Sequence, residues 1–233
     1  MTASLLIATR NRSAQLRHGL ASIWPYRAGV DEVIVVDDGS TDETENLFAA
    51  NADWLKAHKI ERAGGFRANP SAVWNYAHSL SHGDIAIEQG GEVCHLTDCV
   101  GPLVEGCKPG VVVLARVHNG TIAEMRVLSQ TIAAGRYDFP DDVTPEAAHF
   151  NADKLEVPRV GVDQIQLYCG IERPVPFLFL GAIHRTDFER IGGYDVTIDR
   201  NNDGDLARRL WESGVRFLFL GRAMAFHLEH PKT

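Results

Sequence analysis

Segments patterned like strands alternate with segments patterned like helices through the first hundred residues, and this alternation constrains the fold more than any other feature. Short apolar runs cover residues 4–8, 32–36 and 84–87. The run at 32–36 is apolar enough to be buried on both faces of a sheet. Apolar residues between the runs recur at helical spacing. This order predicts an α/β fold with an open, mostly parallel sheet and helices on both faces.

Capping signals predict where the first helices begin. Ser13 is a candidate N-cap for the first helix, and Ser40 with Glu43 has the spacing of a capping box for the second. Asn69 precedes Pro70, which combines an N-cap with a proline at the first helical position. We therefore expect a helix to follow each of the first two strands and a third to open at residue 70.

The second half of the chain has a different pattern. Residues 111–117 and 121–127 flank an Asn-Gly pair, which predicts a β-hairpin with a type I′ turn. Residues 129–176 have weak periodicity and several prolines, which predicts a loop-rich stretch. Strands are then expected at 177–183 and 216–220. We expect this half to form a small antiparallel extension, so that residues 1–233 make one domain.

Two more helices are expected in this half. Thr186 and Glu189 have the spacing of a capping box, and Gly192-Gly193 would end the helix that they start. A last helix is expected to end at Gly214, before the strand at 216–220.

Composition excludes several classes of protein. No apolar run approaches the roughly 18–20 residues of a membrane span, so no integral membrane segment is expected. The N-terminus has no basic leader, and the four cysteines lack metal-type spacing, which favours a reduced, cytoplasmic protein. The net charge of −8 argues against a protein that binds nucleic acid or anionic membranes over its whole surface.

Polar clusters follow three of the predicted strands, at residues 9–12 (TRNR), 37–40 (DDGS) and 88–92 (EQGGE). Ligands of parallel α/β sheets bind beyond the carboxyl ends of the strands. Carboxylates there suit ribose hydroxyls and a base, and arginines suit a diphosphate. Alternatively, Asp37 and Asp38 only cap the next helix.

Four longer strings carry a resemblance to a known family. They are VIVVDDGSTD at 33–42, FLGAIHR at 179–185 with IGGYD at 191–195, and NDGDL at 202–206. In this order, and after the cluster at 9–12, they resemble family-two glycosyltransferases of the GT-A fold. The resemblance covers nearly the whole chain. It implies a Rossmann-like sheet with a nucleotide-sugar-binding half at residues 1–110 and an acceptor-binding half at 111–233.

The resemblance also implies a substrate-binding set: Thr9, Arg10, Arg12, Asp37, Asp38, Arg67, Gly181 and Asn202. Within it, Thr9, Arg12 and Asp38 would contact the nucleotide, and Asp37 would help to orient its base. Arg67 would reach the diphosphate from the turn at 64–67. A plain turn is an equally weighted interpretation of Gly64-Gly65.

The family's Asp-x-Asp metal motif corresponds to Gly90-Gly91-Glu92 in this chain. The resemblance thus implies that Glu92 binds Mn²⁺ or Mg²⁺, and that the first carboxylate is lost at Gly90. His227 matches a position where a histidine joins the metal, and imidazole beside oxygen ligands favours Mn²⁺. Glu88 is a lower-ranked alternative ligand.

Asp203 matches the family's catalytic base, a carboxylate that takes the proton of the acceptor hydroxyl. The alternative is an acid placed by the dipole at a helix start, an explanation that fits Asp205 better.

The resemblance implies an inverting, metal-dependent glycosyltransferase that transfers a hexose or related sugar. The donor would be a nucleotide-diphosphate sugar, most simply a UDP-sugar. A glycan, a protein and a hydroxylated base in nucleic acid all stay open as acceptors. The competing hypothesis is a catalytically degenerate module that binds nucleotide sugars or glycans, which the loss of a carboxylate at Gly90 would explain.

Overall fold

The computed structural model describes residues 1–61, 69–147, 149–150, 155–160, 165–198 and 200–230. Its strands are β1 (Ala3–Thr9), β2 (Glu32–Asp37), β3 (Lys56–Lys59), β4 (Ile85–Gly90), β5 (Val93–His95), β6 (Val111–Gly120), β7 (Arg159–Val160), β8 (Ile165–Cys169), β9 (Leu180–His184) and β10 (Arg216–Leu228). Its helices are α1 (Ser13–Ile23), the 3₁₀ helix η1 (Trp24–Gly29), α2 (Thr44–Ala50), α3 (Pro70–Leu80), α4 (Val100–Gly106), α5 (Ile122–Ala133), α6 (Arg185–Arg190) and α7 (Asn202–Glu212).

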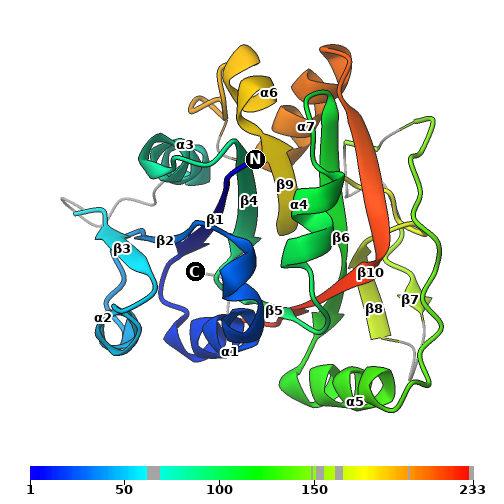
Figure 1. The fold of residues 1–233 in the computed structure, drawn as a ribbon, viewed down its shortest axis with the longest axis horizontal. Helices are drawn as coiled ribbons and strands as arrows, with labels where there is room; N and C mark the ends of the chain where they lie inside the picture. Colours follow the sequence, from blue (N-terminus) through cyan, green and yellow to red (C-terminus); the bar gives the residue numbers. More distant parts are fainter. Residues whose placement is uncertain (62–68, 148, 151–154, 161–164, 199, 231–233) are drawn as a thin grey trace.

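The strands form one sheet in the order β3-β2-β1-β4-β9-β6-β10-β5, with β7 and β8 attached beside β6 (Figure 1). The four strands from β3 to β4 are parallel, and so are β6 and β10. Strand β9 runs antiparallel between β4 and β6. The carboxyl ends of β1, β2 and β4 therefore lie at one edge, where Thr9 is in register with Asp37 and Ala8 with Gly90.

Helices cover both faces of this sheet. Side chains alternate along each buried strand, so the strand presents apolar residues to the helices on either face. Leu5 and Ile7 of β1 pack in one core cluster with residues of α1, α2 and α4. Leu6, between them, packs in another cluster with residues of α3, α6 and α7. The expected α/β fold, with an open sheet and helices on both faces, is confirmed.

The predicted hairpin at 111–127 is wrong. Strand β6 continues to Gly120, and α5 begins at Ile122. Strands β8, β9 and β10 pair with β6 and leave no edge for a hairpin partner. Thr121 and Glu124 form a capping box, and the apolar residues Ile122, Met125, Leu128 and Ile132 of α5 pack in a third core cluster at helical spacing.

The predicted cap of α3 is confirmed, since the Asn69 side chain accepts a hydrogen bond from the backbone N–H of Ser71 at 2.9 Å. The predicted cap of α2 is wrong. This helix begins at Thr44, whose N–H donates to Asp42. Ser40 instead donates to Asp37 within the preceding loop.

Two further predicted caps are displaced by one or two residues. Ser13 is the first residue of α1 rather than its cap. In α6, His184 accepts from the N–H of Thr186, so Thr186 lies inside the helix rather than capping it.

Two strands run further than their apolar cores predict, and the extra residues matter for the site. Strand β4 continues to Gly90 and so carries Glu88 inside the sheet. Strand β10 continues to Leu228 and places His227 beside Asn119 at the end of β6. No helix in the described part of the chain combines the length and the apolar character needed to cross a membrane.

Candidate active site

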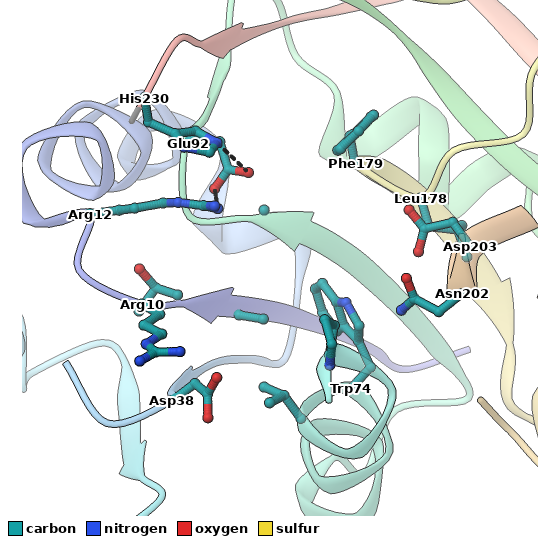
Figure 2. A pocket seen from close by; sticks show the side chains of 15 residues that line it. Arg10, Arg12, Asp38, Trp74, Glu92, Leu178, Phe179, Asn202, Asp203 and His230 are labelled. Carbon is teal, nitrogen blue, oxygen red and sulfur yellow. Dashed lines mark hydrogen bonds and ion pairs between the residues drawn. The ribbon is translucent and has the colours of Figure 1, made fainter. Parts of the chain in front are cut away.

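A cavity of about 500 Å³ opens above the carboxyl ends of β1, β2 and β4 (Figure 2). Its walls are completed by α3, by the segment before β9 and by the start of α7. The residues lining it are Ala8, Thr9, Arg10, Arg12, Asp38, Pro70, Val73, Trp74, Gly90, Glu92, Leu178, Phe179, Asn202, Asp203 and His230. The position agrees with the general rule that ligands of such sheets bind beyond the carboxyl ends of the strands.

One end of the cavity is formed by Thr9, Arg10 and Asp38, at the ends of the two neighbouring strands β1 and β2. The N–H of Asp38 donates to the carbonyl of Thr9 at 2.9 Å, which ties these strand ends together. Asn11 adopts a left-handed conformation, with φ of 49°, and its side chain accepts from the N–H of Thr41. These bonds fix the two polar loops against each other.

Asp37 points away from this cavity. It is 1% exposed and accepts hydrogen bonds from both the N–H and the hydroxyl of Ser40. Asp37 thus shapes the loop that presents Asp38. The N–H of Thr44, the first residue of α2, donates to Asp42, and the Asp37 carboxylate accepts from Ser40, so Asp37 does not cap that helix.

The carboxylate of Glu92 joins three cationic or basic side chains. Its Oε2 lies 2.6 Å from Arg12 Nη1, and its Oε1 lies 3.2 Å from His227 Nε2 and 3.9 Å from His230 Nε2. Figure 2 shows Arg12 and His230 converging on Glu92 from two sides. Although burial acts to raise the pKa of Glu92, the hydrogen bond from His227 and the charges of Arg12, His227 and His230 hold it at about 2. Glu92 is therefore a carboxylate at any physiological pH.

This cluster has the donor atoms of a divalent metal site. Ligand atoms of Glu92, His227 and His230 lie within 4.8 Å of one another. His227 Nδ1 donates to the side-chain oxygen of Asn119 at 2.9 Å, and Nε2 is the ring nitrogen that faces Glu92. The rings of Tyr168 and Phe179 pack on His227 and hold its orientation. One hard oxygen with two imidazoles fits Mn²⁺ better than Mg²⁺.

His230 was not identified from the sequence, because the family resemblance pointed to His227 alone as the metal-binding histidine. The spacing of the two histidines, three residues apart at a strand end, is the signal that could have found it. Gly90 lines the cavity directly beside this cluster, and a Cβ built there would lie 3.1 Å from Glu92 Oε1.

Asp203 lies across the cavity, on the first turn of α7. Figure 2 shows Asp203 and Asn202 on the opposite side of the cavity from Glu92 and His230, with Trp74 projecting between. Burial, and then the negative charge of Glu88, raise the pKa of Asp203 to about 7. Asp205 faces Arg208 and Arg209 at 2.8 and 2.7 Å instead. The structure thus separates the two acids into one at the cavity and one on the helix surface.

The remaining residues of the predicted set lie elsewhere. Gly181 is in β9 opposite Glu88, and a Cβ there would meet Leu114 at 2.7 Å and Leu178 at 2.8 Å. The absence of a side chain at Gly181 therefore leaves room for Leu178, and Leu178 does line the cavity. Arg67 and the Gly64-Gly65 turn lie outside the described residues.

Glu88, the alternative metal ligand, is turned away from the metal-type cluster. It is fully buried, and its two oxygens are held by His78 and Tyr194.

Comparisons with known proteins give a consistent result. The family model for glycosyl transferase family 2 matches residues 4–160. No curated protein matches the sequence significantly. Among solved structures, the mannosyltransferase PcManGT from Pyrobaculum calidifontis, in complex with GDP-Man and Mn²⁺, is similar over 96% of this chain and 56% of its own, with a TM-score of 0.58 and 17% identity.

Two other solved structures are similar to this chain. S. aureus TarS 1-349 in complex with UDP-GlcNAc matches over 100% of this chain and 60% of its own, with a TM-score of 0.63 and 16% identity. GalNAc-T7 with UDP, GalNAc and Mn²⁺ matches over 99% of this chain and 44% of its own, with a TM-score of 0.62 and 15% identity. The chain therefore spans only about half of the length of these proteins. At these identities the likeness shows the fold, which is the GT-A fold.

Proposed function

Because the chain belongs to glycosyl transferase family 2, we propose that it transfers a sugar from a nucleotide-diphosphate donor to an acceptor hydroxyl, with inversion at the sugar and with the aid of a divalent metal. One observation carries the proposal. A single cavity has side chains suited to binding a nucleotide at one end and a cluster of metal-binding donor atoms beside them. On its opposite wall lies the carboxyl group of Asp203, with a pKa of about 7.

The donor end is the loop region of β1 and β2. Asp38 offers a carboxylate to ribose or base, and Arg10 and Arg12 offer guanidinium groups to a diphosphate. The similar solved structures hold UDP, UDP-GlcNAc or GDP-Man. A UDP-sugar is our first choice, and Arg67 remains a proposed contact to the diphosphate.

Glu92, His227 and His230 would hold the metal, which when bound offsets negative charge on the leaving diphosphate. Arg12, in contact with Glu92, lies where it can add a second positive charge. Two of the similar structures contain Mn²⁺, which agrees with the imidazole-rich donor set.

Asp203 is the proposed base. As the acceptor oxygen forms its bond to the anomeric carbon, the bond to the diphosphate breaks and the hydroxyl proton moves to the Asp203 carboxylate. A base with a pKa near 7 is half ionised at neutral pH and still strong enough to accept a proton. Asn202 and the rings of Trp74 and Phe179 border the space between Asp203 and the donor end, where the sugars would lie.

We place the acceptor on the side of the cavity that Phe179, Asn202 and Asp203 form. The division of one domain into a donor half at 1–110 and an acceptor half at 111–233 remains part of the proposal. A glycan, a protein or a hydroxylated base remain the candidate acceptors, and a cytoplasmic location remains a prediction.

A screen of nucleotide sugars by thermal shift, with and without Mn²⁺, would identify the donor, and a transfer assay with that donor tests the proposal. Asp203→Asn is expected to keep donor affinity and to lower the transfer rate about 10²–10⁴-fold. Asp205→Asn is the matched control and should keep most activity, because Asp205 faces surface arginines. Equal rates for Asp203→Asn and the unmodified chain would refute the assignment of the base.

The degenerate-module hypothesis rests on one observation, the missing carboxylate at Gly90. It predicts nucleotide-sugar binding with no transfer to any acceptor and no hydrolysis of the donor. The same assay therefore distinguishes the two functions.

A further inference from the structure

Arg12 already occupies one of the two oxygens of the carboxylate that would hold the metal. Its Nη1 lies 2.6 Å from Glu92 Oε2, which is the distance of a charge-assisted hydrogen bond. The other oxygen, Oε1, faces the Nε2 atoms of His227 and His230 at 3.2 and 3.9 Å. A cation that belongs to the protein is therefore in contact with the same group that a divalent ion needs.

The net charge of this cluster depends on Arg12. Imidazoles bind metal in their neutral form, so His227 and His230 add no charge to a cluster that is ready for metal. The charges of Glu92 and Arg12 then cancel. Without Arg12 the same donor atoms would carry one negative charge. Because Arg12 and a divalent ion compete for one buried carboxylate, Arg12 should lower the metal affinity of the free chain.

Arg12 is the member of this ion pair that can move. The side chain of Glu92 is 6% exposed, and the carbonyl of Glu92 accepts from the N–H of Leu228 at 3.0 Å, which ties its backbone to the end of β10. The side chain of Arg12 is 22% exposed and reaches Glu92 along a flexible stem of three methylene groups. Rotation of this stem frees Glu92 Oε2 without any change in the strands.

The cavity offers Arg12 a place for a second anionic partner. Arg12 lines the cavity with Arg10 and Asp38, and Figure 2 shows it reaching Glu92 from the side where Arg10 lies. The Nε of Arg12 is buried and has no hydrogen-bond partner among the residues that the structure describes. A diphosphate presents several charged oxygens that match the fork of a guanidinium group. A diphosphate bound at this end of the cavity would therefore compete with Glu92 for Arg12.

We propose that Arg12 is a competing cation at Glu92, which lowers the metal affinity of the free chain and leaves Glu92 when a diphosphate binds its guanidinium group. This inference rests on the proposed function and deepens it, because it makes metal binding depend on the donor. Arg12 has Glu92 as its partner in the free chain and the diphosphate as its partner in the complex. Since coupling between two ligands is reciprocal, the metal would also tighten the binding of the diphosphate.

The test is Mn²⁺ binding measured by electron paramagnetic resonance at pH 7.5, for the unmodified chain and for Arg12→Gln, with and without UDP. Arg12→Gln keeps a polar side chain and removes the charge. Without UDP, this variant should bind Mn²⁺ about tenfold more tightly than the unmodified chain, and UDP should then tighten Mn²⁺ binding by a smaller factor. If Arg12 only holds Glu92 in place, the sign is the opposite, since the variant would then bind Mn²⁺ more weakly. The comparison without UDP does not depend on which nucleotide the donor carries.

Two further variants serve as controls. Arg12→Lys keeps the positive charge and should keep the weak Mn²⁺ binding of the free chain. Arg17→Gln removes a charge from the exposed surface of α1 and should change Mn²⁺ affinity by less than about twofold, because exposed charges are screened. Equal or weaker Mn²⁺ binding by folded Arg12→Gln overturns the proposal. If Arg12→Gln does not fold, the unmodified chain decides, since equal Mn²⁺ affinity with and without UDP overturns the proposal as well.

Transfer assays on the same proteins separate this inference from the proposed function. If none of them transfers sugar but Arg12→Gln gains Mn²⁺ affinity, the proposed function fails and the competition at Glu92 stands. If the unmodified chain transfers sugar with Mn²⁺ and Arg12→Gln gains no Mn²⁺ affinity, the inference fails alone. If no protein of the set binds Mn²⁺ with or without UDP, the inference fails together with the metal site.

Discussion

Replacing Asp203 with Asn should stabilise the fold at alkaline pH, although the same change should abolish most activity. The pKa of Asp203 is raised from an ordinary 3.8 to about 7 by burial and by the charge of Glu88. The folded state therefore holds this proton more tightly than the unfolded state does. Stability from this group is present in full below pH 4 and is lost as pH rises to about 7.

The difference of about three pH units sets the magnitude. Each unit corresponds to about 1.4 kcal/mol, which gives about 4 kcal/mol for a fully buried group. Asp203 borders an open cavity, and solvent screening should reduce this to about 2–3 kcal/mol. Asparagine imitates the protonated acid, so Asp203→Asn should be more stable than the unmodified chain by this amount at pH 8 and nearly equal to it at pH 4.

The assay is urea unfolding of both proteins at several pH values between 4 and 8.5. Asp205→Asn is the matched control with the opposite sign. Because Asp205 pairs with Arg208 and Arg209 at the start of α7, its loss should cost about 0.3–1 kcal/mol at neutral pH. A stability difference for Asp203→Asn that does not grow with pH would refute the argument that Asp203 is buried beside a second charge.

Two further predictions concern ligands. Asp38→Ala should weaken nucleotide-sugar binding by about 1.5–3 kcal/mol through loss of hydrogen bonds to a charged acceptor, and calorimetry showing unchanged affinity would remove Asp38 from the donor site. Binding of a nucleoside diphosphate should tighten with Mn²⁺, and this response should disappear in Glu92→Ala, His227→Ala and His230→Ala, whereas full transfer in excess chelator would rule out the metal.

Residue patterns predicted the first strands and helices correctly, because the local signals of apolar runs and helix caps agree there with what the fold buries. The apolar run at 32–36 becomes β2, and Asn69-Pro70 opens α3 as expected. The hairpin at 111–127 failed because strand pairing is decided far along the chain. Strand β6 pairs with β8, β9 and β10, the last of them about one hundred residues later, and the Asn-Gly turn signal could not anticipate these partners.

The candidate site was also predicted only in part. Thr9, Arg10, Arg12, Asp38, Glu92, Asn202 and Asp203 were identified from the sequence, and all of them line one cavity. The sequence could not show that Asp37 turns into its own loop, because that orientation depends on the hydrogen bonds of Ser40. It also could not show that Glu88 is held by His78 and Tyr194, because those partners come from α3 and from the loop after α6.

A glycine at position 90, where the resemblance implies a carboxylate in the family, has an electrostatic consequence for the proposed metal site. The cluster contains one carboxylate, two imidazoles and the contacting cation Arg12, so the protein groups alone supply little negative charge. A divalent ion would gain much of its attraction from the diphosphate of the donor. Metal and donor should then strengthen each other's binding by the same factor, because coupling between two ligands is reciprocal. The change at Gly90 thus favours a site that is completed by its substrate over a site that holds its metal permanently.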